Sequence, residues 1–202
     1  MKQNIYFHPI WLRLWHLINA IMFLLLILTG LSMQYSIFSI RFDIAVTLHN
    51  ICGIILSISY LYYFIANFLT GNLKYYRIKF KGFIKKLMLQ FRYYTLGIFK
   101  KEKEPFPLTE KRKFNPLQKL SYVAVMYFFV PLIIISGLAM LFPKVIYDRI
   151  LGVPGMLITD IVHIIAGFIG SIFMIIHVYF CTIGTKPLSN FKSIINGYTE
   201  IE

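Results

Sequence analysis

Histidines stand out in this sequence because four of the five lie inside long apolar stretches. These four are His16, His49, His163 and His177, whereas His8 lies outside the stretches. An ionisable side chain inside a membrane costs free energy and usually marks a functional site. Away from the ends of the stretches there is no Asp, Glu or Lys, which argues against a proton relay or a cation transporter. Histidine without carboxylates indicates a metal or cofactor ligand.

The spacing of His163 and His177 indicates how many cofactors are involved. Fourteen residues separate the two histidines. An α-helix turns about 100° and rises about 1.5 Å per residue, so both imidazoles share one face and lie about 21 Å apart along the axis. This distance is too long for one metal centre and suits one ligand for each of two stacked cofactors. Each cofactor then needs a second axial ligand from another helix.

Four apolar stretches must position these side chains, at about 14–34, 44–70, 118–142 and 156–181. Each is long enough for a transmembrane helix, which needs about 20 residues. Hydrophobic residues make up 58% of the chain and charged residues 14%, whereas a soluble protein carries about 25% charged residues. We therefore predict a single domain over residues 1–202 with an all-α fold, an integral membrane four-helix bundle in the lipid bilayer.

The positive charge of the chain, +13 overall, is concentrated between two of these stretches. Of the 21 Lys and Arg residues, 14 lie between Lys74 and Lys119. This concentration argues against a nucleic-acid partner, because the charge is not spread over a binding face, and it is typical of a cytoplasmic loop. We therefore expect the connection at about 72–117 to be cytoplasmic, with an interfacial amphipathic helix in part of it. Both termini are then cytoplasmic too.

This orientation pairs the histidines by depth. His16 and His177 lie towards the cytoplasmic side, and His49 and His163 towards the outer side. Neither cysteine lies in a C-x-x-C-H motif, so a haem would be bound without a covalent link. The bundle is therefore predicted to hold two stacked b-type haems, each with two axial histidines. Such ligation leaves no open position at the iron, which suits electron transfer.

Smaller residues near the histidines are further candidates. Gly30, Gly53 and Gly170 would let a flat macrocycle approach a helix, although glycines also permit close helix packing. Arg13 lies three residues before His16, so it could pair with a haem propionate or extend to the membrane surface. Arg41 could do the same on the outer side.

Several of these residues belong to segments that resemble a known family. The segments are His8-Pro9, Arg13-Leu14-Trp15-His16, Leu28-Thr29-Gly30 and His163-x13-His177-Val178-Tyr179. They are similar to the bacterial dihaem b-type cytochromes that serve as membrane subunits of nickel-iron hydrogenase, formate dehydrogenase and thiosulfate reductase. In this chain Leu17 follows the first histidine where the family usually has Trp. The resemblance implies a four-helix core with two b haems that links a quinone to a redox partner outside the membrane.

The resemblance also suggests a quinone site. The formate dehydrogenase branch binds menaquinone beside the cytoplasmic haem, partly through an Asn and a Gln at the start of the third core helix. Asn115 and Gln118 match that segment. The alternative is a structural role, because Asn is a favoured N-cap and Pro116 a favoured first helical residue. His8 and Tyr179 could donate hydrogen bonds to the same site.

The function implied by the resemblance is a quinone-reactive electron-transfer subunit in the bacterial inner membrane. It would carry electrons between an extracytoplasmic iron-sulfur or multihaem cytochrome subunit and the menaquinone or ubiquinone pool, in a direction set by the partner. One alternative is a stand-alone b-type shuttle of the superoxide or metal reductase type. Another is a haem-free four-helix membrane protein with metal-binding histidines.

Overall fold

The computed structural model describes residues 3–35, 37–109, 112–183 and 188–201. The first two long helices are α1, Ile10–Tyr35, and α2, Phe42–Leu69. The third long helix runs through α4, Pro116–Ala124, the π-helical segment η4, Val125–Phe129, and α5, Val130–Leu141, and the fourth is α6, Gly155–Cys181. All four are long and apolar enough to cross a membrane. The expected fold class is confirmed, and the largest difference in a helix boundary is at the start of α1.

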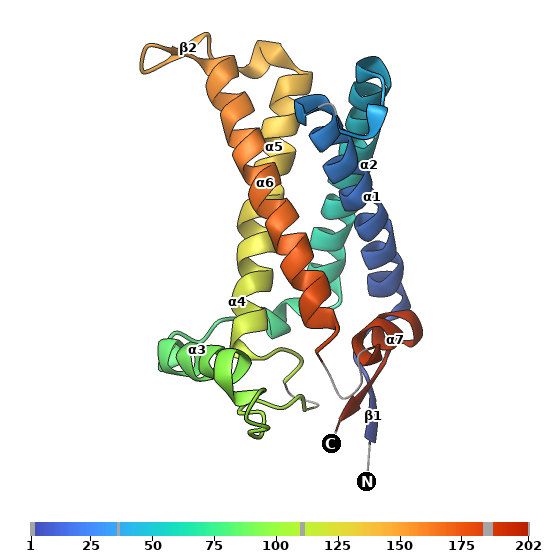
Figure 1. Ribbon diagram of the computed structural model, residues 1–202, viewed down its shortest axis with the longest axis vertical. Helices are drawn as coiled ribbons and strands as arrows, with labels where there is room; N and C mark the ends of the chain where they lie inside the picture. The colour runs from blue at the N-terminus through green and yellow to red at the C-terminus, as the bar shows by residue number, and fades with distance from the viewer. Residues whose placement is uncertain (1–2, 36, 110–111, 184–187, 202) are drawn as a thin grey trace.

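The four long helices stand side by side as two helical hairpins (Figure 1). One hairpin is α1 with α2, and the other is α5 with α6; the helices of each pack together, whereas α2 and α5 come close at few positions. We call the end that carries the helices α3, Phe83–Arg92, and α7, Ser189–Asn196, the basic end. The opposite end, with the short strands β2, Arg149–Ile150, and β3, Val153–Pro154, is the hairpin end.

The third long helix contains a widened turn just before Pro131. Proline has no N–H group, and its ring would clash with the carbonyl four residues earlier in an α-helix. The π-helical segment η4 immediately precedes α5, whose second residue is Pro131. The Tyr60 hydroxyl donates to the carbonyl of Met126 at 2.9 Å, so α2 satisfies part of this irregular backbone. The helix thus accommodates Pro131 with a π-helical turn.

The basic end contains the elements that lie outside the spans. The 3-10 helix η2 covers Asn72–Tyr75, and α3, Phe83–Arg92, continues into a π-helical turn, η3, Tyr93–Gly97. In Figure 1, α3 lies across the direction of the long helices, as expected for an interfacial helix. The strand β1, Gln3–Tyr6, pairs antiparallel with β4, Tyr198–Ile201, which follows the helix α7, Ser189–Asn196. We did not predict this ribbon from the sequence.

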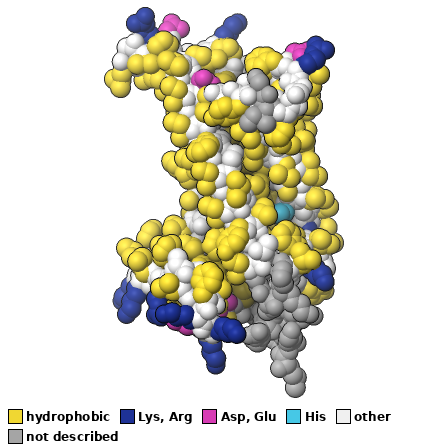
Figure 2. All heavy atoms as spheres, in the orientation of Figure 1, with side chains coloured by type: hydrophobic (Ala, Val, Ile, Leu, Met, Phe, Trp, Pro, Cys, Tyr) yellow, Lys and Arg dark blue, Asp and Glu magenta, His cyan; other side chains and the backbone are white. Residues whose placement is uncertain are grey.

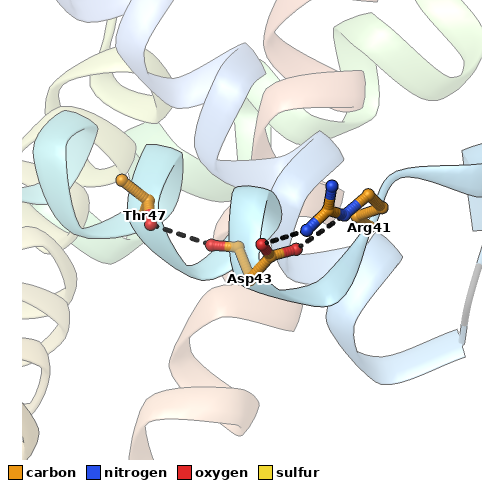
Figure 3. A network of polar contacts seen from close by, with 3 residues as sticks. All are labelled: Arg41, Asp43 and Thr47. Carbon is orange, nitrogen blue, oxygen red and sulfur yellow. Dashed lines mark hydrogen bonds and ion pairs between the residues drawn. The ribbon is translucent and has the colours of Figure 1, made fainter.

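The hairpin end is shorter. It consists of the 3-10 helices η1, Ile37–Ser39, and η5, Pro143–Val145, and the small ribbon of β2, Arg149–Ile150, with β3, Val153–Pro154. At the start of α2, the Arg41 guanidinium donates to both carboxylate oxygens of Asp43, at 3.2 and 2.7 Å (Figure 3). The Arg41 side chain is 75% exposed. Because Arg41 already has a carboxylate partner, the structure adds no support for its contact with a propionate.

The surface has the pattern of a membrane protein. Figure 2 shows hydrophobic side chains over the middle of the visible face, with Lys and Arg gathered at both ends. Large apolar side chains of all four long helices are exposed, among them Leu24, Ile58, Ile135 and Phe168. An apolar surface of this extent on a monomer requires lipid or a partner to cover it.

Candidate cofactor site

The structure brings together the two histidine pairs expected from their depths. The rings of His16 on α1 and His177 on α6 have centroids 6.3 Å apart, towards the basic end. The rings of His49 on α2 and His163 on α6 have centroids 6.2 Å apart, towards the hairpin end. We call these the basic-end pair and the hairpin-end pair. In each, an imidazole from the α5–α6 hairpin faces one from the α1–α2 hairpin.

These separations fit a metal ion held between two imidazoles. A metal–nitrogen bond of about 2 Å and about 1.1 Å from a ring nitrogen to the ring centroid place two axial rings about 6.3 Å apart. Within the described residues, no group of three or more His, Cys, Asp or Glu side chains could hold a metal ion. A metal between either pair must therefore bring its remaining ligands with it, as the iron of a haem does.

Hydroxyl groups determine the orientation of the hairpin-end pair. Thr29 Oγ1 lies 2.9 Å from His49 Nδ1, and Ser136 Oγ lies 2.9 Å from His163 Nδ1. Each hydroxyl also donates its one hydrogen to a carbonyl of its own helix, of Leu25 and Leu132 respectively, at 2.7 Å. The hydroxyl must then accept from the imidazole, so Nδ1 carries the proton in both histidines. This tautomer leaves Nε2 unprotonated and available to a metal.

Glycines lie beside the same pair. A Cβ atom on Gly30 would lie 3.6 Å from Cε1 of His49, and one on Gly137 would lie 3.0 Å from Cε1 of His163. Gly137 was not predicted from the sequence. A Cβ atom on Gly53 would meet nothing within 4 Å, and one on Gly170 would meet Cδ1 of Ile133 at 3.5 Å. A haem contact at Gly53 or Gly170 stays a prediction.

Both hydroxyl residues were also missed, although the sequence contains a signal for them. Each precedes its glycine in a similar apolar tetrapeptide, Leu28-Thr29-Gly30-Leu31 and Ile135-Ser136-Gly137-Leu138. The first tetrapeptide serves the histidine of α2, and the second serves the histidine of α6. This short repeat in the first and third spans therefore places an equivalent hydroxyl group beside each histidine of the hairpin-end pair.

Aromatic rings and a thiol surround the basic-end pair. Phe173 stacks on His177 with centroids 5.7 Å apart, and Cys181 Sγ lies 3.8 Å from His177 Nε2. Tyr122 lies edge-on to His177 at 6.5 Å. The two pairs therefore have chemically different surroundings, hydroxyl at the hairpin end and aromatic at the basic end.

Polar contacts with α2 hold α1 in place near His16. Trp15 Nε1 donates to the carbonyl of Ser59 at 3.0 Å, and Asn19 Nδ2 donates to Ser59 Oγ at 2.6 Å. The Trp15 ring also stacks on the buried Tyr63 with centroids 4.2 Å apart. These contacts fix the rotation of α1 and so direct His16 away from α2, towards α6.

Basic side chains that are buried or half-buried lie at the same end of the bundle. Arg13 lies one turn before His16, and its Nη1 donates to the carbonyl of Ile195 in α7. Lys113 is 6% exposed, and burial lowers its pKa to about 8. Burial, with the charges of Lys113, His16 and Arg13, lowers the pKa of His8 to about 4. His8 is therefore neutral at pH 7 in this structure.

Asn115 and Gln118 form a capping box at the start of α4. The Asn115 side-chain oxygen accepts from the backbone N–H of Gln118 at 2.8 Å, and Gln118 Oε1 accepts from that of Asn115 at 3.1 Å. Asn115 Nδ2 donates to the Tyr94 hydroxyl at 2.7 Å. The pair thus has the helix-capping role that was the alternative to quinone contact. The Gln118 amide nitrogen lies outside the box, and quinone contact stays a prediction.

An apolar groove of about 550 Å³ lies between the end of α2 and the third long helix. It is lined by Phe68, Gly71, Leu73, Lys74, Tyr76, Arg77, Val123 and Tyr127. Within the described residues, the Tyr127 hydroxyl is buried without a hydrogen-bond partner. Ring contacts connect the groove to the basic-end pair, since Phe114 contacts both Tyr76 and Tyr122, and Tyr122 contacts His177. A planar apolar molecule with a carbonyl group would suit this groove.

Comparison with known proteins now identifies the class of protein. A family model described as prokaryotic cytochrome b561 matches residues 8–197, and the chain belongs to this family. It is therefore a transmembrane b-type haem protein of electron transfer. The putative cytochrome YdhU of Escherichia coli (strain K12) is 36% identical over 197 residues, which are 97% of this chain and 75% of that protein. No solved structure matches the chain.

Proposed function

We propose that the chain binds two b-type haems, one between each histidine pair, and carries electrons across the membrane between them. The observation that supports this most strongly is the equal spacing of the two pairs, 6.3 and 6.2 Å, with α6 contributing one histidine to each. Bound haem supplies reversible one-electron chemistry at iron. His16 with His177, and His49 with His163, would hold it and would leave no position for other iron ligands.

We further propose that the basic end faces the cytoplasm and exchanges electrons with a quinone. The concentration of Lys and Arg in this end supports the orientation through the positive-inside rule. The groove beside Tyr127 supports quinone binding, because its lining is mainly apolar and its buried hydroxyl is free to donate to a carbonyl. The hairpin end would then exchange electrons with an extracytoplasmic iron-sulfur or multihaem cytochrome subunit.

Haem counting tests the number and placement of the haems. The purified chain should contain two haems with reduced-minus-oxidised b-type spectra. His163→Ala should remove the haem of the hairpin end and leave that of the basic end, whereas His16→Ala should do the reverse. A preparation without haem, or loss of both haems in each variant while the chain remains folded, would contradict the proposal.

Reduction assays test the quinone and the partner. Quinol should reduce the haem of the basic end, and Tyr127→Phe should slow this step while the haem content stays at two per chain. Purification from the native membrane should yield an extracytoplasmic redox subunit with the chain. Quinol-driven reduction of a small outer acceptor by the chain alone would favour the stand-alone shuttle.

A further inference from the structure

The basic end holds a buried positive charge, that of Lys113, for which the described residues provide no ion-pair partner. Lys113 is 6% exposed, and its ammonium group lies 5.5 Å from the ring centroid of Tyr75 and 5.7 Å from that of Phe114. Among the described residues, no carboxylate is within 4 Å of it. A buried charge without a partner is costly, so a lysine in this position needs an anion.

Two further buried nitrogen atoms at this end have no hydrogen-bond partner among the described residues. The Nε atom of Arg13 and the Nδ1 atom of His8 are buried, and neither has a hydrogen-bond partner within the described part of the chain. Arg13 is anchored through Nη1 to the Ile195 carbonyl, and His8 is anchored through its backbone N–H to the Gly197 carbonyl at 3.2 Å. The C-terminal segment thus anchors the side chain of Arg13 and the backbone of His8.

Charge effects and ring contacts connect these side chains to the basic-end pair. His8 interacts electrostatically with Lys113, Arg13 and His16. On the other side, Lys113 is connected to His177 through the ring contacts of Phe114 and Tyr122. The three side chains come from separate segments: His8 precedes α1, Arg13 lies on α1 one turn before His16, and Lys113 lies in the loop before α4.

We propose that Lys113, Arg13 and His8 form a carboxylate site that binds the propionates of the haem held by the basic-end pair. This inference rests on the proposed function. It gives an anionic partner to the buried Lys113 and to His8. The sequence alone suggested a propionate contact only for Arg13 at this end. A haem carries two propionates, and both need charged or hydrogen-bonded partners when they are buried.

Haem with masked propionates provides the test. The His163→Ala chain is prepared without haem in lipid nanodiscs and titrated with protohaem or with its dimethyl ester. We expect protohaem to bind about tenfold more tightly than the ester, the ratio that one hydrogen bond to a charged group accounts for. Lys113→Met should abolish most of this ratio by weakening protohaem binding alone, and Lys113→Arg should retain it. Lys85→Met, at an exposed lysine of α3, is the matched control.

The outcomes separate this inference from the proposed function. An unsubstituted chain that binds no haem would contradict the proposed function itself. The unsubstituted chain could bind two haems while Lys113→Met leaves the acid-to-ester ratio of the His163→Ala chain unchanged. This result would contradict only the carboxylate site, and would indicate that a free anion or a lipid phosphate is the partner of Lys113. Glu110 lies outside the described residues, so Glu110→Gln completes the set. If Glu110→Gln abolished the ratio as Lys113→Met does, Glu110 would be the partner of Lys113 and the inference would be wrong.

Discussion

Two hydroxyl residues give the hairpin-end pair a defined tautomer, whereas His177 of the basic-end pair contacts aromatic rings and a thiol. An imidazole that donates from Nδ1 is a stronger electron donor to a metal at Nε2. Stronger donation favours the oxidised metal. The residues around the two pairs would therefore give a haem bound at the hairpin end a lower potential than one bound at the basic end.

We predict that Thr29→Val and Ser136→Ala raise the potential of the hairpin-end haem. Each substitution removes the acceptor of a hydrogen bond that contributes about 0.5–1.5 kcal/mol. In a one-electron couple this free energy corresponds to an upward shift in potential of at most about 20–60 mV. A potentiometric titration of the two haems measures the shift. Thr47→Val is a matched control, because Thr47 Oγ1 also donates to a carbonyl four residues earlier, that of Asp43, and lies at the exposed start of α2. A shift in the control as large as in Thr29→Val would contradict the explanation.

At the scale of the elements, Asn115 combines two roles that substitutions can separate. Asn115→Ala removes the cap of α4 and the bond to Tyr94, and we expect it to lower the free energy of unfolding by about 0.5–2 kcal/mol. Asn115→Asp keeps the capping oxygen and loses only the donor to Tyr94, so it should retain most of the stability. Thermal unfolding in detergent compares the two. Equal losses would show that the Tyr94 contact, and not the cap, stabilises this junction.

Gly197 connects α7 to the terminal ribbon in a conformation that requires glycine. Its φ is +90°, and a Cβ atom would lie 2.5 Å from Cε2 of Tyr6 and 2.9 Å from the carbonyl oxygen of His8. Gly197→Ala should therefore destabilise the β1–β4 ribbon. The loss should exceed the roughly 1–2 kcal/mol that the left-handed backbone conformation alone costs a residue with a Cβ atom. Gly71→Ala, at φ +65° with nothing within 4 Å, is the control for that backbone cost.

Hydrogen exchange of the ribbon amides measures this effect. We expect faster exchange in β1 and β4 of Gly197→Ala, and no change there in Gly71→Ala. Unchanged exchange in both variants would show that the ribbon tolerates the side chain.

The sequence predicted the long elements better than the short ones, for a physical reason. A span of about 20 apolar residues has few alternatives in a membrane, so α1, α2 and α6 could be placed from composition, and the 14-residue interval placed His163 and His177 on one face. The β1–β4 ribbon depends on a pairing between opposite ends of the chain, which local patterns do not encode. Ser136 and Gly137 were missed because their role depends on how α5 packs against α6.

At the scale of the whole molecule, the contacts between the two helical hairpins differ from the contacts within each hairpin. Helices pack closely within each hairpin, and facing imidazoles span the space between α6 and the α1–α2 hairpin. Without a cofactor, few backbone contacts connect the hairpins. Haem binding would therefore contribute to the folded bundle as well as to its chemistry, because a ligand that binds only the folded state stabilises it.

The orientation of the molecule follows from its charge and can be measured directly. Lys103, in the basic end, and Lys144, at the hairpin end, are both exposed. In a background with both native cysteines replaced by alanine, Lys144→Cys should react with an impermeant maleimide on intact spheroplasts. Lys103→Cys should react only after the membrane is opened, because the positive-inside rule predicts a cytoplasmic location for the loop with most of the Lys and Arg. The reverse pattern would place the basic end outside, and would move the proposed quinone groove to the opposite side of the membrane.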